Sequence, residues 1–269
     1  MKYKKTLIFS IFILILAVGF GGWYYNAHKE SSYAVKQTRT ATVFIPGLGG
    51  NFITSDYMVS SWDKDGVATR ALQVYVKNDG KVETTKQFAK VGKNNPVIQA
   101  NFQTNNKPAQ EARLMPNLMR YLHQKYGIKH VNLIGHSSGG EIIYNYLTDK
   151  DGLNKVPAKD LPQVDHFVSM ANTYPLHDKN IKNLLKNLEI LNFCGDIDHT
   201  GSDGLIPTRD VKQFGTLVKG HVKSYKFMVY HGDPQQAQHS MLHENPAVNK
   251  IIAQYMYNQL KRTSFGIIS

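Results

Sequence analysis

The chain alternates between two patterns of hydrophobic and polar positions. Short apolar runs, several of them rich in β-branched residues, predict buried strands at 41–45, 96–102, 131–134, 164–170, 188–194 and 225–230. Apolar residues three and four positions apart predict helices at 111–126, 142–147 and 246–260. Because strands alternate with helices, we expect an α/β fold with a mainly parallel sheet that helices cover on both faces.

Two further strand-like runs depart from this alternation. Residues 71–77 and 81–85 flank Asn78, Asp79 and Gly80. An Asn-Asp-Gly turn between two such runs is typical of a β-hairpin. We therefore expect a β-hairpin insertion in the parallel sheet.

The first 28 residues have the pattern of a membrane-inserting segment. Lys2, Lys4 and Lys5 precede a nearly unbroken apolar run at 7–20, and an aromatic cluster follows at 23–25. At about 1.5 Å per residue, a helix of this length approaches the thickness of a bilayer core. Lysines before the run and aromatic residues after it favour an orientation in which the following domain lies outside the cytoplasm.

Two interpretations of this segment stay open. The residues around Ala27 make a poor small-residue cleavage site, which favours an uncleaved signal-anchor over a cleaved signal peptide. The segment contains no cysteine, which excludes a lipoprotein. The polar stretch 29–40 then predicts a short tether, and 41–269 a single α/β domain.

Composition narrows the class of protein. The 269 residues carry a formal net charge of +12 at pH 7, which favours contact with polyanions such as an anionic cell wall, next to the simpler interpretation of a solvated basic surface. The lysines are scattered, without zinc-finger spacing or an aromatic RNA-binding pattern, so we do not expect nucleic acid as a partner. The single cysteine, Cys194, excludes an internal disulfide, and its apolar neighbours predict a buried strand residue.

Residues 135–139 read Gly-His-Ser-Ser-Gly and fit the pattern G-x-S-x-G. They follow a predicted buried strand and open a predicted helix, which is the strand–turn–helix setting of a nucleophile elbow. Gly135, Gly139 and Gly140 are small enough for the tight turn that raises the central hydroxyl above the carboxyl edge of the sheet. We therefore predict Ser137 as the nucleophile of a serine hydrolase.

A serine nucleophile needs a general base and an acid that orients this base, in the chain order Ser, Asp or Glu, His for this fold. The acid should follow the strand 188–194. Asp203 is our choice, because Asp-Gly-Leu-Ile-Pro at 203–207 resembles the acid-bearing segment of many lipases. Asp196 lies nearer to the strand end and is the alternative, although Asp196 and Asp198 also fit the role of turn carboxylates that bind local N–H groups.

The base should follow the strand 225–230. His239 fits best, because the chain before it is long enough to return over Ser137. His231 fits a turn residue equally well, and His243 a capping or surface histidine.

The remaining histidines receive no chemical role from the sequence. We expect His136 to pack sideways beside the nucleophile without transferring a proton. The others, including His199, are expected to be solvent-exposed rather than metal ligands, since no H-E-x-x-H spacing occurs.

An oxyanion hole needs two converging backbone N–H groups. One should belong to Ser138, directly after the nucleophile, and the other to the glycine-rich loop 46–50, where Leu48 is the expected donor. A phosphate-binding loop is excluded, because no G-K-[ST] sequence follows.

These residues resemble the α/β-hydrolase superfamily over about residues 40–260. Five segments look like those of predicted cell-surface hydrolases from Gram-positive bacteria: F-I-P-G-L-G-G at 44–50, N-D-G at 78–80, G-H-S-S-G-G at 135–140, S-D-G-L-I-P at 202–207 and H-S-M-L-H-E-N-P at 239–246. Many relatives have His-Gly where this chain has Pro-Gly at 46–47, but the glycine and its backbone donors remain. The resemblance implies an esterase- or lipase-like activity without a defined substrate.

The expected function is hydrolysis of a carboxylic ester, from a small molecule or a lipid, through an acyl-enzyme on Ser137. The enzyme would act at the outer face of the cell membrane or after secretion, and this chemistry needs no metal or organic cofactor. Two alternatives stay open: an acyltransferase or amidase with the same triad, and a surface-anchored binding module with a non-catalytic hydrolase fold. Residues 174–186 are a candidate cap over the site.

Overall fold

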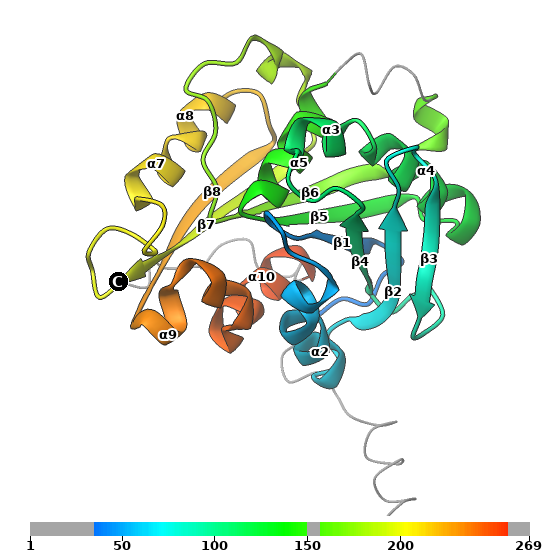
Figure 1. Cartoon of the computed structure of the whole chain (residues 1–269), viewed down its shortest axis with the longest axis horizontal. Helices are drawn as coiled ribbons and strands as arrows, with labels where there is room; N and C mark the ends of the chain where they lie inside the picture. Colours follow the sequence, from blue (N-terminus) through cyan, green and yellow to red (C-terminus); the bar gives the residue numbers. More distant parts are fainter. Residues whose placement is uncertain (1–34, 150–156, 258–269) are drawn as a thin grey trace, which may run out of the picture.

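The computed structural model describes residues 35–149 and 157–257, which form a sheet with helices on both faces (Figure 1). The strands are β1 (Ala41–Ile45), β2 (Thr69–Val76), β3 (Val82–Gln87), β4 (Pro96–Phe102), β5 (His130–His136), β6 (Gln163–Met170), β7 (Glu189–Ile197) and β8 (Ser224–Gly232). They form an eight-stranded sheet in the order β3-β2-β4-β1-β5-β6-β7-β8. All neighbouring pairs are parallel except β2 and β3, which form the expected antiparallel hairpin. The predicted fold class is therefore confirmed.

Helices cover the two faces of this sheet. The α-helices are α2 (Asp56–Lys64), α3 (Pro108–Ala112), α4 (Met115–Tyr126), α5 (Ser138–Thr148), α7 (Thr208–Lys212), α8 (Phe214–Val218), α9 (Pro234–Ala237) and α10 (Pro246–Tyr257). Short 3-10 turns are η1 (Phe52–Ser55), η2 (Ala158–Asp160), η3 (Lys179–Asn183) and η4 (His239–Glu244). Figure 1 shows α3, α4 and α5 on one side of the sheet and α2 and α10 on the other.

Two hydrophobic clusters fill the spaces between the sheet and its helices. Alternate residues of one strand belong to different clusters: Val43 and Leu133 pack toward α4 and α5, whereas Phe44 and Ile134 pack toward α2 and α10. This division follows from the two-residue repeat of a strand. Because both faces are buried, the central strands read as continuous apolar runs rather than as alternating ones.

The predicted helix 111–126 is wrong in one respect, because it is two helices. Helix α3 ends at Ala112 and α4 begins at Met115. The break lies before Pro116, whose ring has no N–H to donate and would clash with the carbonyl of Ala112 in a continuous helix. The N–H of Leu114 instead bonds the Glu111 carbonyl at 2.9 Å, three residues back.

Strands β7 and β8 both run beyond their predicted ends. Strand β7 continues through Asp196 to Ile197, and β8 through His231 to Gly232. Cys194 is buried in β7 as expected, and burial raises the pKa of its thiol to about 12. It is therefore a packing residue rather than a reactive thiol.

The expected membrane-inserting segment, 1–28, lies outside the described residues. Across 35–149 and 157–257, no helix has both the length and the apolar character that crossing a bilayer requires. The expected tether, 29–40, is described from residue 35 onward, and that part is bonded to the domain. The N–H of Lys36 donates to the Tyr257 carbonyl at 3.1 Å, and that of Thr38 donates to the Asn95 side chain at 2.8 Å.

Candidate active site

The predicted nucleophile elbow lies where β5 passes into α5. Ser137 has φ 51° and ψ −130°, a conformation that is unfavourable for any residue with a side chain. Its N–H donates to the carbonyl of Met170 on β6 at 2.8 Å, which ties the turn to the neighbouring strand. Backbone strain that is held in this way is typical of functional sites.

Two glycines let the chain pass through this turn. A Cβ on Gly135 would lie 2.4 Å from the backbone nitrogen of Gly140, and a Cβ on Gly139 would lie 2.3 Å from the carbonyl oxygen of Ile45. Backbone atoms at such distances would have to shift, so neither position accepts a side chain. The G-x-S-x-G spacing therefore has a steric origin in the close packing of α5 against β1 and β5.

The glycine-rich loop after β1 approaches Ser137 closely. A Cβ on Gly47 would lie 2.9 Å from the Cβ of Ser137. Asn105, just beyond β4, holds this loop. Its side-chain Nδ2 donates to the carbonyls of Gly47 and Gly50, and its backbone carbonyl accepts the N–H of Gly49 at 2.8 Å. Sequence analysis missed Asn105. The only signal for it is its position after β4, because the carboxyl ends of β4 and β1 lie at the same edge of the sheet.

The two expected oxyanion donors are backbone N–H groups near the elbow. Ser138 is the first residue of α5, and N–H groups in the first turn of a helix have no acceptor inside it. The N–H of Leu48 has no acceptor in the part of the chain that the structure describes. The side chain of Leu48 is 67% exposed, so any role of this residue at the reacting carbonyl depends on its backbone. Both assignments stay predictions.

Asp203 is fully buried in the loop that follows β7. Its Oδ1 accepts the N–H groups of Leu205 and Ile206 at 2.9 and 2.7 Å, and its Oδ2 lies 2.8 Å from Nδ1 of His239. Burial alone raises the pKa of this carboxyl, but the bonds from His239 and the two N–H groups outweigh burial and lower the pKa below its ordinary value. Asp203 is therefore an ionised carboxylate at neutral pH.

His239 begins the 3-10 turn η4 and is buried. The Asp203 carboxylate accepts the Nδ1–H of its ring, and the Asp203 carbonyl accepts its backbone N–H at 2.9 Å. This arrangement leaves Nε2 as the ring nitrogen that can accept a proton. No hydrogen bond joins the Ser137 hydroxyl to His239 among the described residues, but the neighbour of Ser137, His136, contacts the His239 ring with centroids 4.9 Å apart.

His136 holds the base from the elbow side. Its Nε2 donates to the carbonyl of His239 at 2.9 Å. Burial, together with repulsion from His243 and His239, lowers the pKa of His136 to about 3. His136 is therefore neutral and packs sideways beside the nucleophile. Its expected lack of a proton-transfer role stays a prediction.

The interpretation of His243 as a surface histidine is wrong, because its side chain is buried. The alternative of a capping histidine stays a prediction. Its ring packs edge-on against the ring of His136, with centroids 4.8 Å apart. Burial, with a smaller contribution from His239, lowers the pKa of His243 to about 4. Two neutral, buried imidazoles, those of His136 and His243, therefore lie behind the candidate base.

The alternative acid, Asp196, is paired with a different histidine. Its Oδ2 lies 2.9 Å from Nδ1 of His231, and its Oδ1 accepts the N–H of Gly201 at 2.7 Å. The bond from Gly201 is the contact with a local N–H group that the sequence analysis gave as the alternative role of Asp196. Asp196 is adjacent to His231 because the two are register partners on β7 and β8, and His231 is thus a strand residue rather than a turn residue.

Large apolar side chains are exposed on loops at the carboxyl edge of the sheet. Leu48 and Ile53 follow β1, Leu176 follows β6, and Leu205 follows β7 beside Asp203; their exposed fractions are 67%, 72%, 62% and 66%. Exposed leucines and isoleucines that gather on one edge indicate an apolar binding surface more than scattered ones do.

The candidate cap, 174–186, lies along α5 and contains only the short turn η3. Tyr174 bonds Ser169 at 2.6 Å and stacks on Phe214 with centroids 3.8 Å apart. Further along, Asp178 accepts the Tyr144 hydroxyl at 2.6 Å, and Asn183 donates to the carbonyl of Thr148, the last residue of α5, at 2.8 Å. The segment is therefore bonded to α5 at two points, Asp178 and Asn183.

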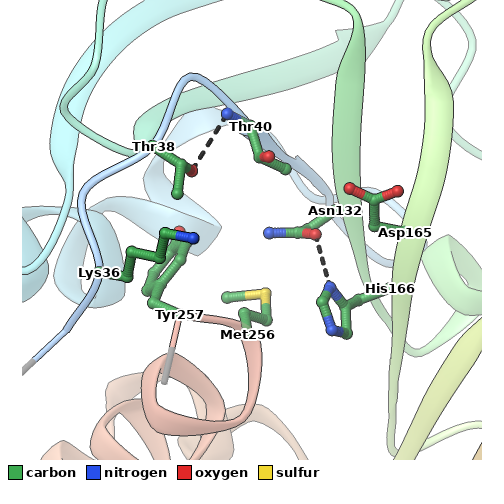
Figure 2. A pocket seen from close by; sticks show the side chains of 8 residues that line it. All are labelled: Lys36, Thr38, Thr40, Asn132, Asp165, His166, Met256 and Tyr257. Carbon is green, nitrogen blue, oxygen red and sulfur yellow. Dashed lines mark hydrogen bonds between the residues drawn. The ribbon is translucent and has the colours of Figure 1, made fainter. Parts of the chain in front are cut away.

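A small cavity lies at the opposite, amino edge of the sheet (Figure 2). Asn132 and His166 lie on its wall and are joined by a hydrogen bond of 2.8 Å between Oδ1 and Nδ1. Its volume is about 30 Å³, which is room for one or two water molecules and not for an ester substrate. This cavity is therefore not a candidate substrate site.

Comparison with known proteins agrees with this fold. A family model described as "Alpha/beta hydrolase of unknown function (DUF915)" matches residues 29–183 and 174–259. A lin2722 gene product from Listeria innocua has the same fold, with 22% sequence identity, a TM-score of 0.68, and coverage of 85% of this chain and 97% of its own. A "putative cell surface hydrolase" from Lactobacillus plantarum WCFS1 follows with 19% identity, a TM-score of 0.64, and coverage of 86% and 94%. No curated protein matches the sequence.

Proposed function

The chain belongs to the DUF915 family of alpha/beta hydrolases of unknown function, and from this membership we propose that it is a serine hydrolase that cleaves carboxylic esters. The observation that carries the proposal is the pairing of two features at one edge of the sheet. One is Ser137 in the strained elbow between β5 and α5, and the other is the buried contact between Asp203 and His239. Together they supply the nucleophile, the base and the orienting acid of acyl transfer.

The reaction begins with attack of the Ser137 hydroxyl on the ester carbonyl. Nε2 of His239 accepts the hydroxyl proton as the bond to carbon forms, and the ionised Asp203 stabilises the resulting imidazolium. The N–H groups of Leu48 and Ser138 bind the oxyanion of the tetrahedral intermediate. The intermediate collapses, and the alcohol leaves with the proton from His239.

Water completes the cycle by attacking the acyl-enzyme. His239 now removes a proton from that water, the second tetrahedral intermediate uses the same N–H donors, and the carboxylic acid leaves as Ser137 recovers its proton. Because His136 and His243 are neutral behind the base, the imidazolium on His239 is the only histidine cation that the cluster must hold during turnover.

The apolar rim formed by Leu48, Ile53, Leu176 and Leu205 favours esters with a hydrocarbon acyl chain. Each buried methylene of such a chain contributes about 0.8 kcal/mol to binding. We expect kcat/KM for nitrophenyl esters to rise from acetate to butyrate and hexanoate. Leu205→Ser should flatten this rise, because it removes apolar surface from the acid loop. Phe88→Ser, directly after β3 and outside the carboxyl-edge loops, should not.

A location at the outer face of the cell membrane belongs to the same proposal. The apolar segment 7–20 with its preceding lysines supports it, as does the surface description of the Lactobacillus relative. Protease digestion of intact cells tests the location: the domain should be cleaved without lysis, and protection until lysis would refute it. In vesicle or wall-binding assays, the basic charge should favour anionic over neutral surfaces.

The proposal is tested by turnover of nitrophenyl butyrate by the full chain and by its Ser137→Ala variant. Wild-type activity that disappears in Ser137→Ala supports the assignment, and activity that persists in the variant refutes it. Added acceptor alcohols separate hydrolysis from acyl transfer, since an acyltransferase would yield the exchanged ester rather than the free acid. A folded wild-type protein that turns over no ester would favour the binding-module alternative.

A further inference from the structure

Three potential metal ligands meet outside the candidate active site. Asp196, His199 and His231 each offer one ligand atom, and these atoms all lie within 4.8 Å of one another. Asp196 is the last residue but one of β7, His231 lies opposite it on β8, and His199 lies in the intervening loop two residues beyond β7. This loop also carries Asp203.

We infer that Asp196, His199 and His231 form a binding site for a divalent transition cation of the zinc class. Two imidazoles and one carboxylate are a donor set that zinc and its neighbours in the transition series accept, whereas Mg²⁺ and Ca²⁺ prefer oxygen ligands alone. Three protein ligands leave at least one position for water. The site is separate from the proposed triad and does not depend on its activity.

The carboxylate is already fixed in place for this role. Asp196 has a buried side chain, 8% exposed, and its Oδ1 accepts the N–H of Gly201 at 2.7 Å. Outer bonds of this kind orient metal-binding carboxylates and are part of most metal sites. The second oxygen, Oδ2, is thereby directed toward His231.

His231 has the spacing that a shared cation requires. Its Nδ1 lies 2.9 Å from Oδ2 of Asp196. Neighbouring ligand atoms around a tetrahedral zinc ion at 2.0–2.1 Å are about 3.3 Å apart, so the two atoms need to separate by only a few tenths of an ångström. A cation between the two atoms binds through the lone pair of Nδ1, so a proton on that nitrogen would pass to solvent.

His199 supplies the third ligand from an exposed position. Its ring stacks on that of His231, with centroids 4.6 Å apart and planes 21° apart. Both Asp198 and His199 have positive φ, 48° and 61°, an unusual pair for residues with side chains. The strained turn directs the imidazole back over the strand ends, and a small rotation of this exposed ring would bring its nitrogen into the coordination sphere.

The site would act as a clamp on the segment that carries the proposed acid. It would join β7, β8 and the intervening loop through three side chains, and its loop ligand, His199, lies only four residues before Asp203. Local sequence offers no signal for it, because His231 lies 32 positions after His199 and comes beside Asp196 only through the parallel register of β7 and β8.

The test is calorimetric titration of the full chain with Zn²⁺, followed by absorption spectroscopy with Co²⁺. We expect one strong Zn²⁺ site, an affinity at least tenfold lower in His199→Ala and in His231→Ala, and a visible Co²⁺ band that both variants lose. His130→Ala is the matched control, since His130 contacts Asp165 at 3.0 Å without a second histidine in the cluster. This variant should bind Zn²⁺ as the wild type does.

Thermal unfolding adds a readout of the clamp itself. Zn²⁺ should raise the Tm of the wild type and of His130→Ala but not that of His199→Ala, because a ligand that binds the folded state alone stabilises it. Without added metal, His199→Ala should unfold near the wild-type Tm, as its ring is exposed. Absence of Zn²⁺ binding by the wild type, or equal affinity in the wild type and both ligand variants, would overturn the inference.

Discussion

Replacement of Asp203 by asparagine is the substitution whose effect can be worked out in most detail. Oδ1 of Asp203 accepts two N–H groups, from Leu205 and Ile206, and Oδ2 faces Nδ1 of His239. In Asp203→Asn, the amide oxygen must keep the two N–H bonds, because the NH₂ group cannot accept them. The NH₂ group then faces the ring, so that Nδ1 becomes the acceptor and the ring proton moves to Nε2. A protonated Nε2 cannot take the proton of Ser137.

The expected loss in kcat is about 10⁴-fold, as in other triads with the wrong histidine tautomer, which corresponds to about 5.4 kcal/mol of transition-state stabilisation. KM should change little, because substrate binding does not use the ring proton. The assay is hydrolysis of nitrophenyl butyrate by the full chain in the presence of a chelator, so that the inferred cation site does not contribute.

Two further carboxylate variants make this result specific. Asp165→Asn is the matched control, because Asp165 also contacts a histidine, His130 at 3.0 Å, but at the partly exposed amino edge of the sheet; its kcat should stay within twofold of the wild type. Asp196→Asn tests the alternative acid. The reasoning is refuted if Asp203→Asn keeps more than a tenth of the wild-type kcat, or if Asp196→Asn loses more activity than Asp203→Asn.

Three other outcomes follow from the described contacts. Gly139→Ala places a Cβ 2.3 Å from a carbonyl oxygen of β1 and should lower the free energy of unfolding, measured by urea titration, by about 3 kcal/mol. In Gly140→Ala the new Cβ meets the hydroxyl of a tyrosine side chain, so the loss should be smaller. Equal losses in the two variants would contradict this. Asn105→Ala releases the loop beside the nucleophile, so steady-state kinetics should give a kcat roughly 10- to 100-fold lower at similar KM, and a pure KM effect would argue against it. In the folded chain the pKa values of His136 and His243 are about 3 and about 4, below the ordinary 6.5. The unfolded chain therefore takes up protons on these histidines before the folded chain does. Their contribution to the free energy of unfolding is complete above pH 6.5 and is lost as pH falls toward 4, at roughly 1.4 kcal/mol per pH unit for each histidine. Thermal unfolding between pH 4.5 and 6.5 should show this loss, with a shallower slope in His243→Phe, and identical slopes would count against it.

The sequence predicted the elements whose causes are local. Continuous apolar runs identified the central strands, and the Asn-Asp-Gly turn identified the hairpin of β2 and β3. The chain order of the fold brought Asp203 and His239 forward as partners, and the structure has the expected contact between them. The roles of these residues in turnover remain predictions.

The features that the sequence did not predict depend on contacts between distant segments. The pairing of Asp196 with His231 follows from the register of β7 against β8, which no local pattern encodes. Asn105 holds the loop after β1 only because β4 is the neighbour of β1 in the sheet. The break before Pro116 is different, because the proline was a local signal that the helical spacing of its neighbours outweighed.

The central claim is that Ser137 is an activated nucleophile, and covalent labelling with a fluorophosphonate probe tests it most directly. The full chain, its Ser137→Ala variant and its His239→Ala variant are treated with the probe, and the modified peptide is identified by mass spectrometry. We predict a single phosphonylated residue, Ser137, in the wild type and no labelling in either variant. Labelling at another residue, or a folded wild-type chain that does not react at all, would contradict the assignment.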